Sequence, residues 1–305
     1  MKIREFETEL QRRYNKNRRK ERRVNDMRKI GKILFAGFVL ISAVIFSQTV
    51  QAARYKTLYT NSGWPVEDRT VGGTVFSSDY STLTESSRLF AEKDGRTVTI
   101  STSFNGGAVI SNGSTVYYCA KSAGRPALYK ASVSKGTSKK MGNLAGAGHY
   151  VDLAGLYKNT VYYIIDVPEG EFARFTLKNG KSKKLRFGEA VTSADQKGKY
   201  FILTDGTGAG YSYLGAYNAA KGKFRRFAKS PCQWHIVSKY VYFAEVIKGE
   251  AYANQPYTIR VKRYAFSGGK TKTLVKSLKV KEVMKISTKG ITYKNTSGKK
   301  KTKKW

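Results

Sequence analysis

The chain repeats one kind of segment at intervals of about 40 to 50 residues. Each segment is rich in Val, Tyr and Phe, and the segments begin at Val75, Val116, Val161, Lys199, Val241 and Ile291. The steps between them are 41, 45, 38, 42 and 50 residues. A period of this size with several strands per unit is typical of propeller blades. No stretch after Ala53 carries a long apolar pattern of period 3.6, so the repeat favours small stacked sheets over helical solenoids.

Each unit divides into four expected strands, A to D. In the third unit these are Tyr150–Leu156, Thr160–Ile165, Phe172–Lys178 and Lys183–Phe187. In the second unit they are Ala108–Ser111, Thr115–Ala120, Ala127–Val133 and Ser138–Leu144. Five units carry glycine between strands C and D, at Gly95, Gly136, Gly180, Gly222 and Gly268. Glycine supplies the positive φ that tight hairpins need, which indicates turn chemistry and not a phosphate-binding loop.

Strand B of three units carries two adjacent aromatic residues, for example Tyr162-Tyr163. Successive side chains of a strand face opposite ways, so one ring of each pair should point toward each neighbouring blade. Burial of such rings contributes about 25 cal/mol per Å² of apolar area. We therefore interpret the aromatic pairs as core residues without a role in ligand binding.

These features predict an all-β fold, a β-propeller in which six blades are favoured and five are possible. The last unit is incomplete, because Glu282–Thr288 and Gly290–Asn295 fill strands A and B and Lys299–Trp305 leaves room for only one more. We expect Arg54–Thr60 to supply the missing outer strand and close the ring, since closure removes exposed sheet edges.

The N-terminal part differs from the rest. Residues 1–32 form a basic leader, and an apolar stretch with the motif Val50-x-Ala52 follows in residues 33–52. This pattern predicts a secretory signal cleaved after Ala52, with a retained membrane anchor helix as the alternative. Translation from Met1 or from Met27 fits either case. The positive flank keeps the N-terminus cytoplasmic, so residues 54–305, the predicted propeller domain, should lie outside the membrane.

The units share a sequence pattern, which in the third unit runs from Val161-Tyr162-Tyr163 to Lys183-Lys184-Leu185. It resembles that of the TolB-like six-bladed β-propeller repeat proteins that bacteria export, over most of residues 70–300. The resemblance implies a propeller fold and an interaction role. It supplies no catalytic residues.

Sequence motifs for chemistry are few. His149 and His235 stand at non-equivalent repeat positions without metal-ligand spacing, so both are interpreted as structural. Cys119 and Cys232 lie in apolar segments, which favours buried thiols, with one long-range disulfide as the alternative. No nucleophile elbow or phosphate-binding loop occurs. We expect no metal, no cofactor and, on balance, no enzymatic activity.

Carboxylates suggest an alternative. Asp166, Glu169 and Glu171 fall in one expected B–C loop and Asp205 in the next. A glycan-active hydrolase or lyase would need two carboxylates at a defined separation, which sequence does not reveal. Such an enzyme would use the B–C face, with Trp234 and His235 as the first residues to mutate. The glycine-rich segment 205–210 lacks calcium-ligand spacing and is interpreted as a flexible connection.

The stronger signal lies in the basic C–D turns. Their cationic residues, the predicted polyanion-binding residues, are Lys135, Lys139, Lys140, Lys181, Lys183, Lys184, Lys221, Lys223, Arg225, Arg226, Lys270 and Lys272. In a propeller all C–D turns emerge on one face, so these charges should form an interrupted ring. Part of this charge would simply keep turns solvated and protect sheet edges.

The charge balance indicates the class of partner. The chain has 57 basic and 21 acidic residues, and 44 and 16 of these follow Ala52. Such an excess favours polyanionic partners. Outside a cell these would be teichoic acids, acidic polysaccharides or the membrane surface, and no nucleic acid is expected. The sequence thus predicts a non-enzymatic, monomeric, secreted or cell-envelope protein that binds an anionic surface polymer, with a protein–protein interaction module as a further alternative.

Overall fold

The computed structural model describes residues 55–60, 65–81, 86–146, 150–167, 170–207, 210–251 and 255–305. The chain divides into two units, Met1–Ala53 and Arg54–Trp305, and the fold described below is that of the second. The predicted leader and the predicted signal or anchor lie outside the described residues. Among the described residues the helical element is the 3-10 turn η1 (Val66–Arg69). No helix within these ranges combines the length and the apolarity that crossing a bilayer requires.

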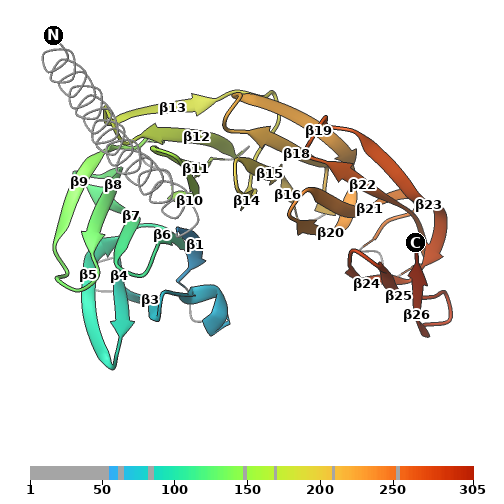
Figure 1. The fold of residues 1–305 in the computed structure, drawn as a ribbon, viewed down its shortest axis with the longest axis horizontal. Coiled ribbons are helices and arrows are strands. Elements are labelled where there is room, and N and C mark those ends of the chain that lie inside the picture. Colours follow the sequence, from blue (N-terminus) through green and yellow to red (C-terminus); the bar gives the residue numbers. More distant parts are fainter. Residues whose placement is uncertain are drawn as a thin grey trace, which may run out of the picture. The chain divides into compact units, whose positions relative to one another are not determined.

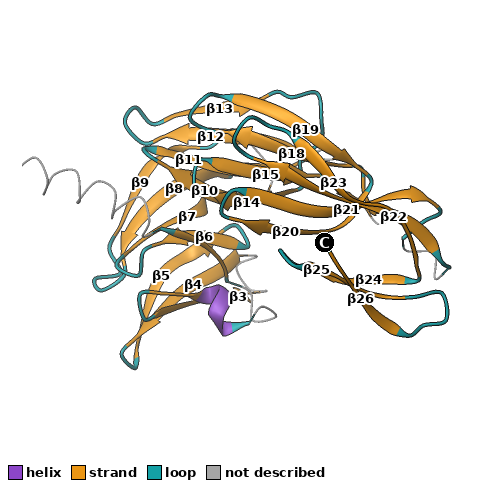
Figure 2. Cartoon of the chain, turned by 45° about the vertical axis from the view of Figure 1, so that its right-hand side comes forward, coloured by secondary structure: helices purple, strands orange, loops and turns teal. Residues whose placement is uncertain are grey.

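Strands account for most of the described chain (Figure 2). The first blade consists of β2 (Thr70–Val71), β3 (Thr74–Ser81), β4 (Ser86–Lys93) and β5 (Arg96–Phe104). The second has β6 (Ala108–Ser111), β7 (Thr115–Ser122), β8 (Arg125–Ser132) and β9 (Ser138–Asn143), with β1 (Lys56–Tyr59) beside it. The third has β10 (Tyr150–Tyr157), β11 (Thr160–Asp166), β12 (Glu171–Thr176) and β13 (Lys181–Leu185).

The remaining blades follow the same plan. The fourth consists of β14 (Ser193–Lys197), β15 (Tyr200–Thr204), β18 (Tyr213–Asn218) and β19 (Lys223–Lys229), with the small hairpin β16 (Gly206–Thr207) and β17 (Gly210–Tyr211). The fifth has β20 (Pro231–Val237), β21 (Tyr240–Lys248), β22 (Tyr257–Ala265) and β23 (Thr271–Val280). The sixth has β24 (Glu282–Ile286), β25 (Gly290–Lys294) and β26 (Lys300–Lys304).

The six units are blades of a β-propeller, as the repeat predicted. Each complete blade is an antiparallel sheet with its strands in chain order, such as β10-β11-β12-β13. In the second to fifth blades the first strand lies on the inner side of the arc in Figure 1, and the fourth strand lies on the outer side. The pair Phe104↔Ala120 joins the first two blades into one nine-stranded sheet. The last blade has three strands, as predicted.

The adjacent aromatic residues of strand B separate onto the two faces of their sheet. Tyr163 packs into the cluster shared with the second blade, whereas Tyr162 packs into the cluster shared with the fourth. Tyr242 and Phe243 divide in the same way between the sixth and fourth blades. The prediction that each ring serves a different neighbour is confirmed, and the alternation of side chains along a strand is its cause.

The junction of the third and fourth blades is the most aromatic part of the core. The ring of Phe201 lies 4.5 Å from that of Tyr162 and 5.6 Å from that of Phe172, centroid to centroid. Tyr217 adds edge contacts to Phe172 at 5.8 Å. These rings are fully buried. Tilted aromatic pairs of this kind add to the free energy of area burial, so this junction holds two blades together.

The C–D hairpins repeat a second packing contact. Gly136, Gly180 and Gly222 have φ values of 64°, 65° and 64°, as the turns require. Two of these hairpins lie against the outer strand of the preceding blade, Gly136 against the carbonyl of Thr99 and Gly180 against that of Met141. A side chain in place of either glycine would meet backbone atoms of the neighbouring blade, whereas a Cβ on Gly222 would meet no atom within 4 Å.

One prediction about the ends of the chain is wrong. The segment Arg54–Thr60 does not complete the last blade, because β1 pairs with β6, the inner strand of the second blade, in the register Leu58↔Val109. Leu58 is buried with Leu89 and Val109 between the first two blades. The apolar side chain of Leu58 thus gains burial between the first two blades.

The described residues of the glycine-rich segment 205–210, which the sequence predicts to be a flexible connection, take part in strand pairing. Gly206 pairs with Tyr211 and Thr207 with Gly210, which makes a short ladder between β15 and β18. Asp205 fixes the base of this hairpin by accepting a hydrogen bond of 2.9 Å from the backbone N–H of Ser212. Residues 205–207 and 210–212 thus extend the fourth blade.

Candidate functional site: a cationic hairpin face

The strand register places two sets of turns at the same end of each sheet. In the third blade, Thr160 opens β11 and lies opposite Thr176, which closes β12. The A–B turn before Thr160 and the C–D turn after Thr176 therefore emerge together. We call this end of the sheets the hairpin face. The B–C connections and the links between blades lie at the other end.

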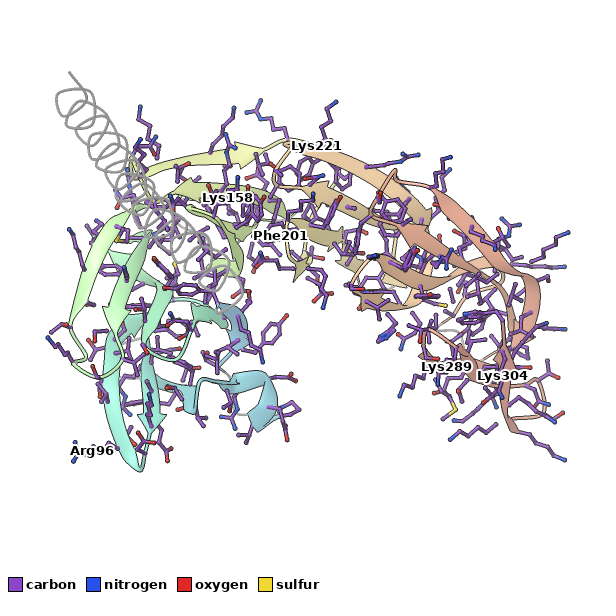
Figure 3. All side chains as sticks on the ribbon, in the orientation of Figure 1. Arg96, Lys158, Phe201, Lys221, Lys289 and Lys304 are labelled. Atoms are coloured by element: carbon purple, nitrogen blue, oxygen red, sulfur yellow. The ribbon has the colours of Figure 1, made fainter. Side chains whose placement is uncertain are left out.

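All the predicted polyanion-binding side chains are exposed, and all of them belong to the C–D turns or to the outer strands that follow these turns. Lys135, Lys221 and Lys270 stand in the turns themselves. Lys183 is part of β13 and Lys223 part of β19. Lys221 is labelled on the outer side of the arc in Figure 3. The structure thus gathers these residues along the outer rim of the second to fifth blades.

The sequence interpretation missed a second group of lysines on the same face. Lys158, Lys199, Lys239 and Lys289 stand in the A–B turns of four blades, and all four are exposed. Each of them comes one or two residues before strand B. That position was already visible in the alignment of the repeats, and it was the signal that could have revealed them. They add an inner row of charge to the outer row of the C–D turns.

Acidic residues are nearly absent from these turns. Among the described A–B and C–D turns the carboxylate is that of Asp94, in the first blade. None of the turn lysines forms an ion pair with another described residue. The ion pairs that do occur lie nearer the opposite end, among them Lys262–Glu245 at 2.5 Å and Lys294–Glu282 at 2.6 Å. The hairpin face therefore carries uncompensated positive charge.

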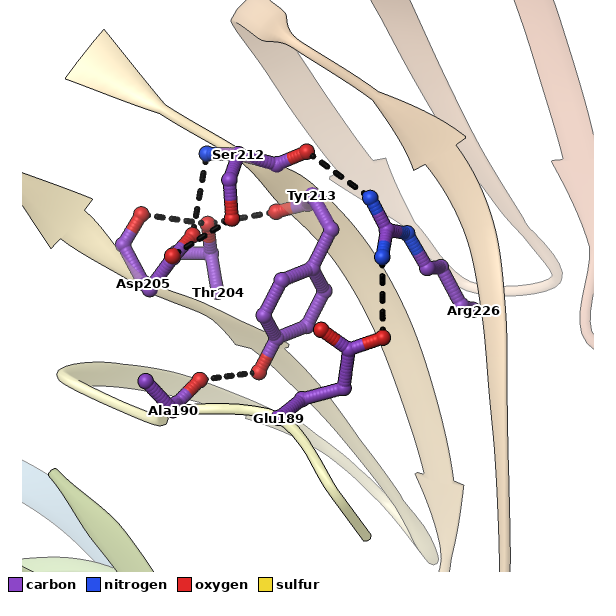
Figure 4. Close-up of polar contacts among 7 residues, drawn as sticks. All are labelled: Glu189, Ala190, Thr204, Asp205, Ser212, Tyr213 and Arg226. Atoms are coloured by element: carbon purple, nitrogen blue, oxygen red, sulfur yellow. Dashed lines mark hydrogen bonds and ion pairs between the residues drawn. The ribbon is translucent and has the colours of Figure 1, made fainter. Parts of the chain in front are cut away.

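Lys140 donates a hydrogen bond of 2.8 Å from its Nζ to the Ser122 hydroxyl, and two further predicted residues have carboxylate partners. Lys184 forms an ion pair of 2.5 Å with Glu171. Arg226 bonds Glu189 at 2.9 Å and donates to the carbonyl of Ser212 at 3.3 Å, as Figure 4 shows. Its guanidinium also lies 5.5 Å from the ring centroid of Tyr213. These two cations stabilise the fourth blade and its neighbour, which leaves them less free for a ligand than the turn lysines.

Two of the carboxylates considered for glycan chemistry, Glu171 and Asp205, are engaged in structural contacts at the other end of the sheets, while Asp166 is exposed at the end of β11. Glu171 is held by Lys184, and Asp205 accepts from the Ser212 hydroxyl at 2.5 Å. Glu169 lies outside the described residues. Within the described ranges no group of His, Cys, Asp and Glu side chains has the arrangement of a metal site.

Trp234 and His235 lie on β20, the inner strand of the fifth blade. The Trp234 ring meets Tyr211 edge-on with centroids 4.9 Å apart. Trp234 thus contacts the β16–β17 hairpin through Tyr211 and the neighbouring inner strand β14 through Asp195. Asp195 on β14 keeps an exposed surface, but the protein atoms around its carboxyl desolvate it and raise its pKa, and a hydrogen bond from Trp234 partly opposes this shift. His149 lies outside the described residues.

The Asp195 shift gives a pH prediction. A carboxyl whose pKa is higher in the folded chain than in the unfolded chain stabilises the fold below the unfolded pKa and loses this contribution as pH rises through the folded pKa. The Tm of Asp195→Asn minus the Tm of the wild type should therefore increase as the pH rises from about 3 to about 7. Thermal melts of both proteins across this range test the expectation. A Tm difference that stays constant or falls with pH would contradict it.

Both cysteines are free thiols, so the disulfide alternative is not realised. Cys119 is buried and Cys232 is half-buried. Burial raises the pKa of each thiol to about 12. Because the thiolate is the reactive form, both side chains should be inert at neutral pH.

No family model matches the sequence, and no curated protein does. Solved structures with a similar arrangement include TolB from Acinetobacter baumannii, which is 15% identical, with 78% of this chain and 64% of that chain covered and a TM-score of 0.42. A putative TolB from Agrobacterium tumefaciens is also 15% identical, with 74% and 89% covered and a TM-score of 0.37. An oligogalacturonate lyase in complex with manganese is 8% identical, with 81% and 77% covered and a TM-score of 0.47. The chain thus spans 64% of the length of the first of these proteins. TolB proteins are among the similar structures, as the sequence resemblance indicated, and the propeller assignment itself rests on the six repeated sheets.

Proposed function

We propose that this protein is a non-enzymatic, exported β-propeller that binds an anionic polymer of the cell envelope through its hairpin face. The observation that carries the proposal is the row of exposed turn lysines without carboxylate partners. Lys135, Lys221 and Lys270 represent its outer row and Lys158 and Lys239 its inner row. Lys184 and Arg226 contribute less, because both are already paired.

The electrostatics favour a long, flexible ligand over a small one. Exposed charges act over a Debye length of about 8–10 Å at physiological ionic strength. A single exposed pair contributes only about 0.2–1 kcal/mol. A polymer that meets many turns at once adds these small terms, whereas a small anion meets only one or two. Teichoic acids, acidic polysaccharides and anionic membrane surfaces all offer such repeated charge.

The test is binding of the full chain to a purified teichoic acid and to an acidic polysaccharide at low and at high salt. The hairpin variant replaces four turn lysines of the second to fifth blades by glutamine: Lys135, Lys158, Lys221 and Lys239. The matched control loses the same net charge at four exposed lysines outside the A–B and C–D turns: Lys121, Lys276, Lys279 and Lys300. Both variants retain the same total charge, so a difference between them reports on the face.

We expect the hairpin variant to bind about ten-fold more weakly at low salt, because four contacts of about 0.3–0.5 kcal/mol each sum to about 1.5 kcal/mol. The control should change by less than about three-fold. Wild-type binding should weaken steeply with salt. Equal losses in the two variants, or binding that does not depend on salt, would refute the hairpin face as the binding surface.

The same assay separates the alternatives. Shortening of the polysaccharide during incubation would indicate the hydrolase or lyase alternative. Retention of another envelope protein at high salt, without polymer binding, would indicate a protein–protein interaction module. Anionic lipid vesicles serve as a third arm and distinguish a membrane surface from a polymer.

A further inference from the structure

A pocket of about 620 Å³ lies between the fourth and fifth blades, away from the hairpin face. Its walls come from the end of β19 on one side and from β21 and β22 on the other (Figure 1). The residues of β21 that line it, 245–247, stand at the B–C end of that strand. A volume of this size is within the range of about 300–1,000 Å³ that small-molecule sites occupy.

The floor of the pocket is apolar and rigidly packed. Phe227 stacks on Tyr264 with ring centroids 4.1 Å apart and meets Phe243 at 5.4 Å. The side chain of Ile247 continues the apolar surface toward solvent, whereas that of Val246 packs on the other face of β21. Ile247 is 41% exposed, whereas the large apolar side chains of the described propeller are mostly buried. An apolar ligand group would cover this side chain and gain the free energy of its burial.

The polar lining is strongly basic. Arg226, Lys229, Arg260 and Lys262 line the pocket, and Glu245 is the carboxylate among the lining residues. Glu245 is 7% exposed, and its Oε1 lies 2.5 Å from the Nζ of Lys262. A buried carboxylate needs such a partner, so Lys262 is committed to Glu245.

Two cations keep donor capacity for a ligand. The Arg260 Nη1 lies 3.7 Å from Glu245 Oε1, which is too far for a hydrogen bond. Lys229 is exposed and forms no ion pair with a described residue. A guanidinium presents paired N–H donors that match the two oxygens of a carboxylate. The positive charge of the pocket thus exceeds what Glu245 compensates.

We propose that this pocket binds a small organic carboxylate with an apolar body. The carboxylate lies between Arg260 and Lys229, and the apolar body covers Ile247 and Phe227. The site shares Arg226 with the predicted polyanion-binding residues but lies away from the turn lysines, so neither proposal depends on the other. The binding of an uncharged molecule of the same shape would lack the contacts to both cations.

Isothermal titration of the full chain with octanoate tests the proposal, with octan-1-ol as the uncharged probe. We expect saturable binding of one octanoate per chain and binding of octanol that is at least about ten-fold weaker. Arg260→Gln and Lys229→Gln should each weaken octanoate binding about five- to ten-fold. Ile247→Asp should reduce it below detection, because it places a negative charge against the apolar body of the ligand.

The variants are chosen so that the fold is retained. Arg260→Gln leaves Glu245 paired with Lys262, and Lys229 and Ile247 are exposed. Thermal melts of each variant verify this, and Lys221→Gln on the hairpin face should bind octanoate as the wild type does. Absence of saturable octanoate binding, equal binding of octanol, or unchanged binding by Arg260→Gln and Ile247→Asp would each overturn the proposal.

Discussion

Replacing Phe201 by alanine is expected to lower the free energy of unfolding by about 3–5 kcal/mol, the range for a buried phenylalanine. Phe201 is fully buried at the junction of the third and fourth blades, where Tyr162 and Phe172 lie against its ring. Figure 3 labels it among the side chains between these blades. Alanine would leave a cavity lined by rings that β-strand backbones hold apart, so relaxation cannot fill it. Urea unfolding of wild type and variant measures the loss.

The matched control for Phe201→Ala is Tyr150→Ala. Tyr150 is also aromatic and also part of a strand, but it is 56% exposed. Its removal should change stability by no more than about 0.5 kcal/mol, as surface substitutions usually do. A loss at Phe201 that is no larger than the loss at Tyr150 would show that the aromatic junction does not hold the two blades together.

Gly170→Ala is the second substitution with a large expected effect. Gly170 has φ +63°, and a Cβ on it would lie 2.4 Å from the carbonyl oxygen of Val191 and 2.8 Å from its carbonyl carbon. Val191 is buried and donates its backbone N–H to the Gly170 carbonyl at 3.1 Å. The methyl group therefore meets backbone of a buried segment that cannot move without breaking this hydrogen bond. We expect a loss of at least about 3 kcal/mol.

Gly222→Ala separates the clash from the backbone strain. Gly222 has nearly the same dihedral angle, φ +64°, but a Cβ on it would meet no atom within 4 Å. Its replacement should cost only the left-handed strain, about 1–2 kcal/mol. Unfolding curves of the two variants, compared with the wild type, give the difference. Equal losses in the free energy of unfolding of the two variants would mean that the backbone at Val191 moves away from the added Cβ at little cost.

The repeat made most of the fold predictable. Strand boundaries in the third blade agree within a few residues, because alternating apolar residues and hairpin glycines such as Gly180 are local signals. The direction of each aromatic ring followed from the same alternation. The position of β1 did not follow, because the choice between the edge of β6 and the edge of β26 depends on burial of Leu58 far along the chain.

The candidate site was predictable in its location but not in its detail. The C–D lysines were found because their turns carry recognisable glycines, whereas the A–B turns carry few such markers and their lysines were overlooked. The partners of Lys184 and Arg226 are 13 and 37 residues away in the sequence, at Glu171 and Glu189. No local pattern connects such pairs, so only the folded structure separates committed cations from free ones.

The uneven placement of charge has an electrical consequence. Lysines without carboxylate partners occupy one end of the sheets, while at the other end basic residues are mixed with Glu171, Glu189, Glu245 and Glu282. A molecule with this arrangement has a permanent dipole moment in addition to its net charge. The electric field of a negatively charged surface would rotate such a protein before first contact. Collisions in a binding orientation would then be more frequent than for a protein with uniformly distributed charge.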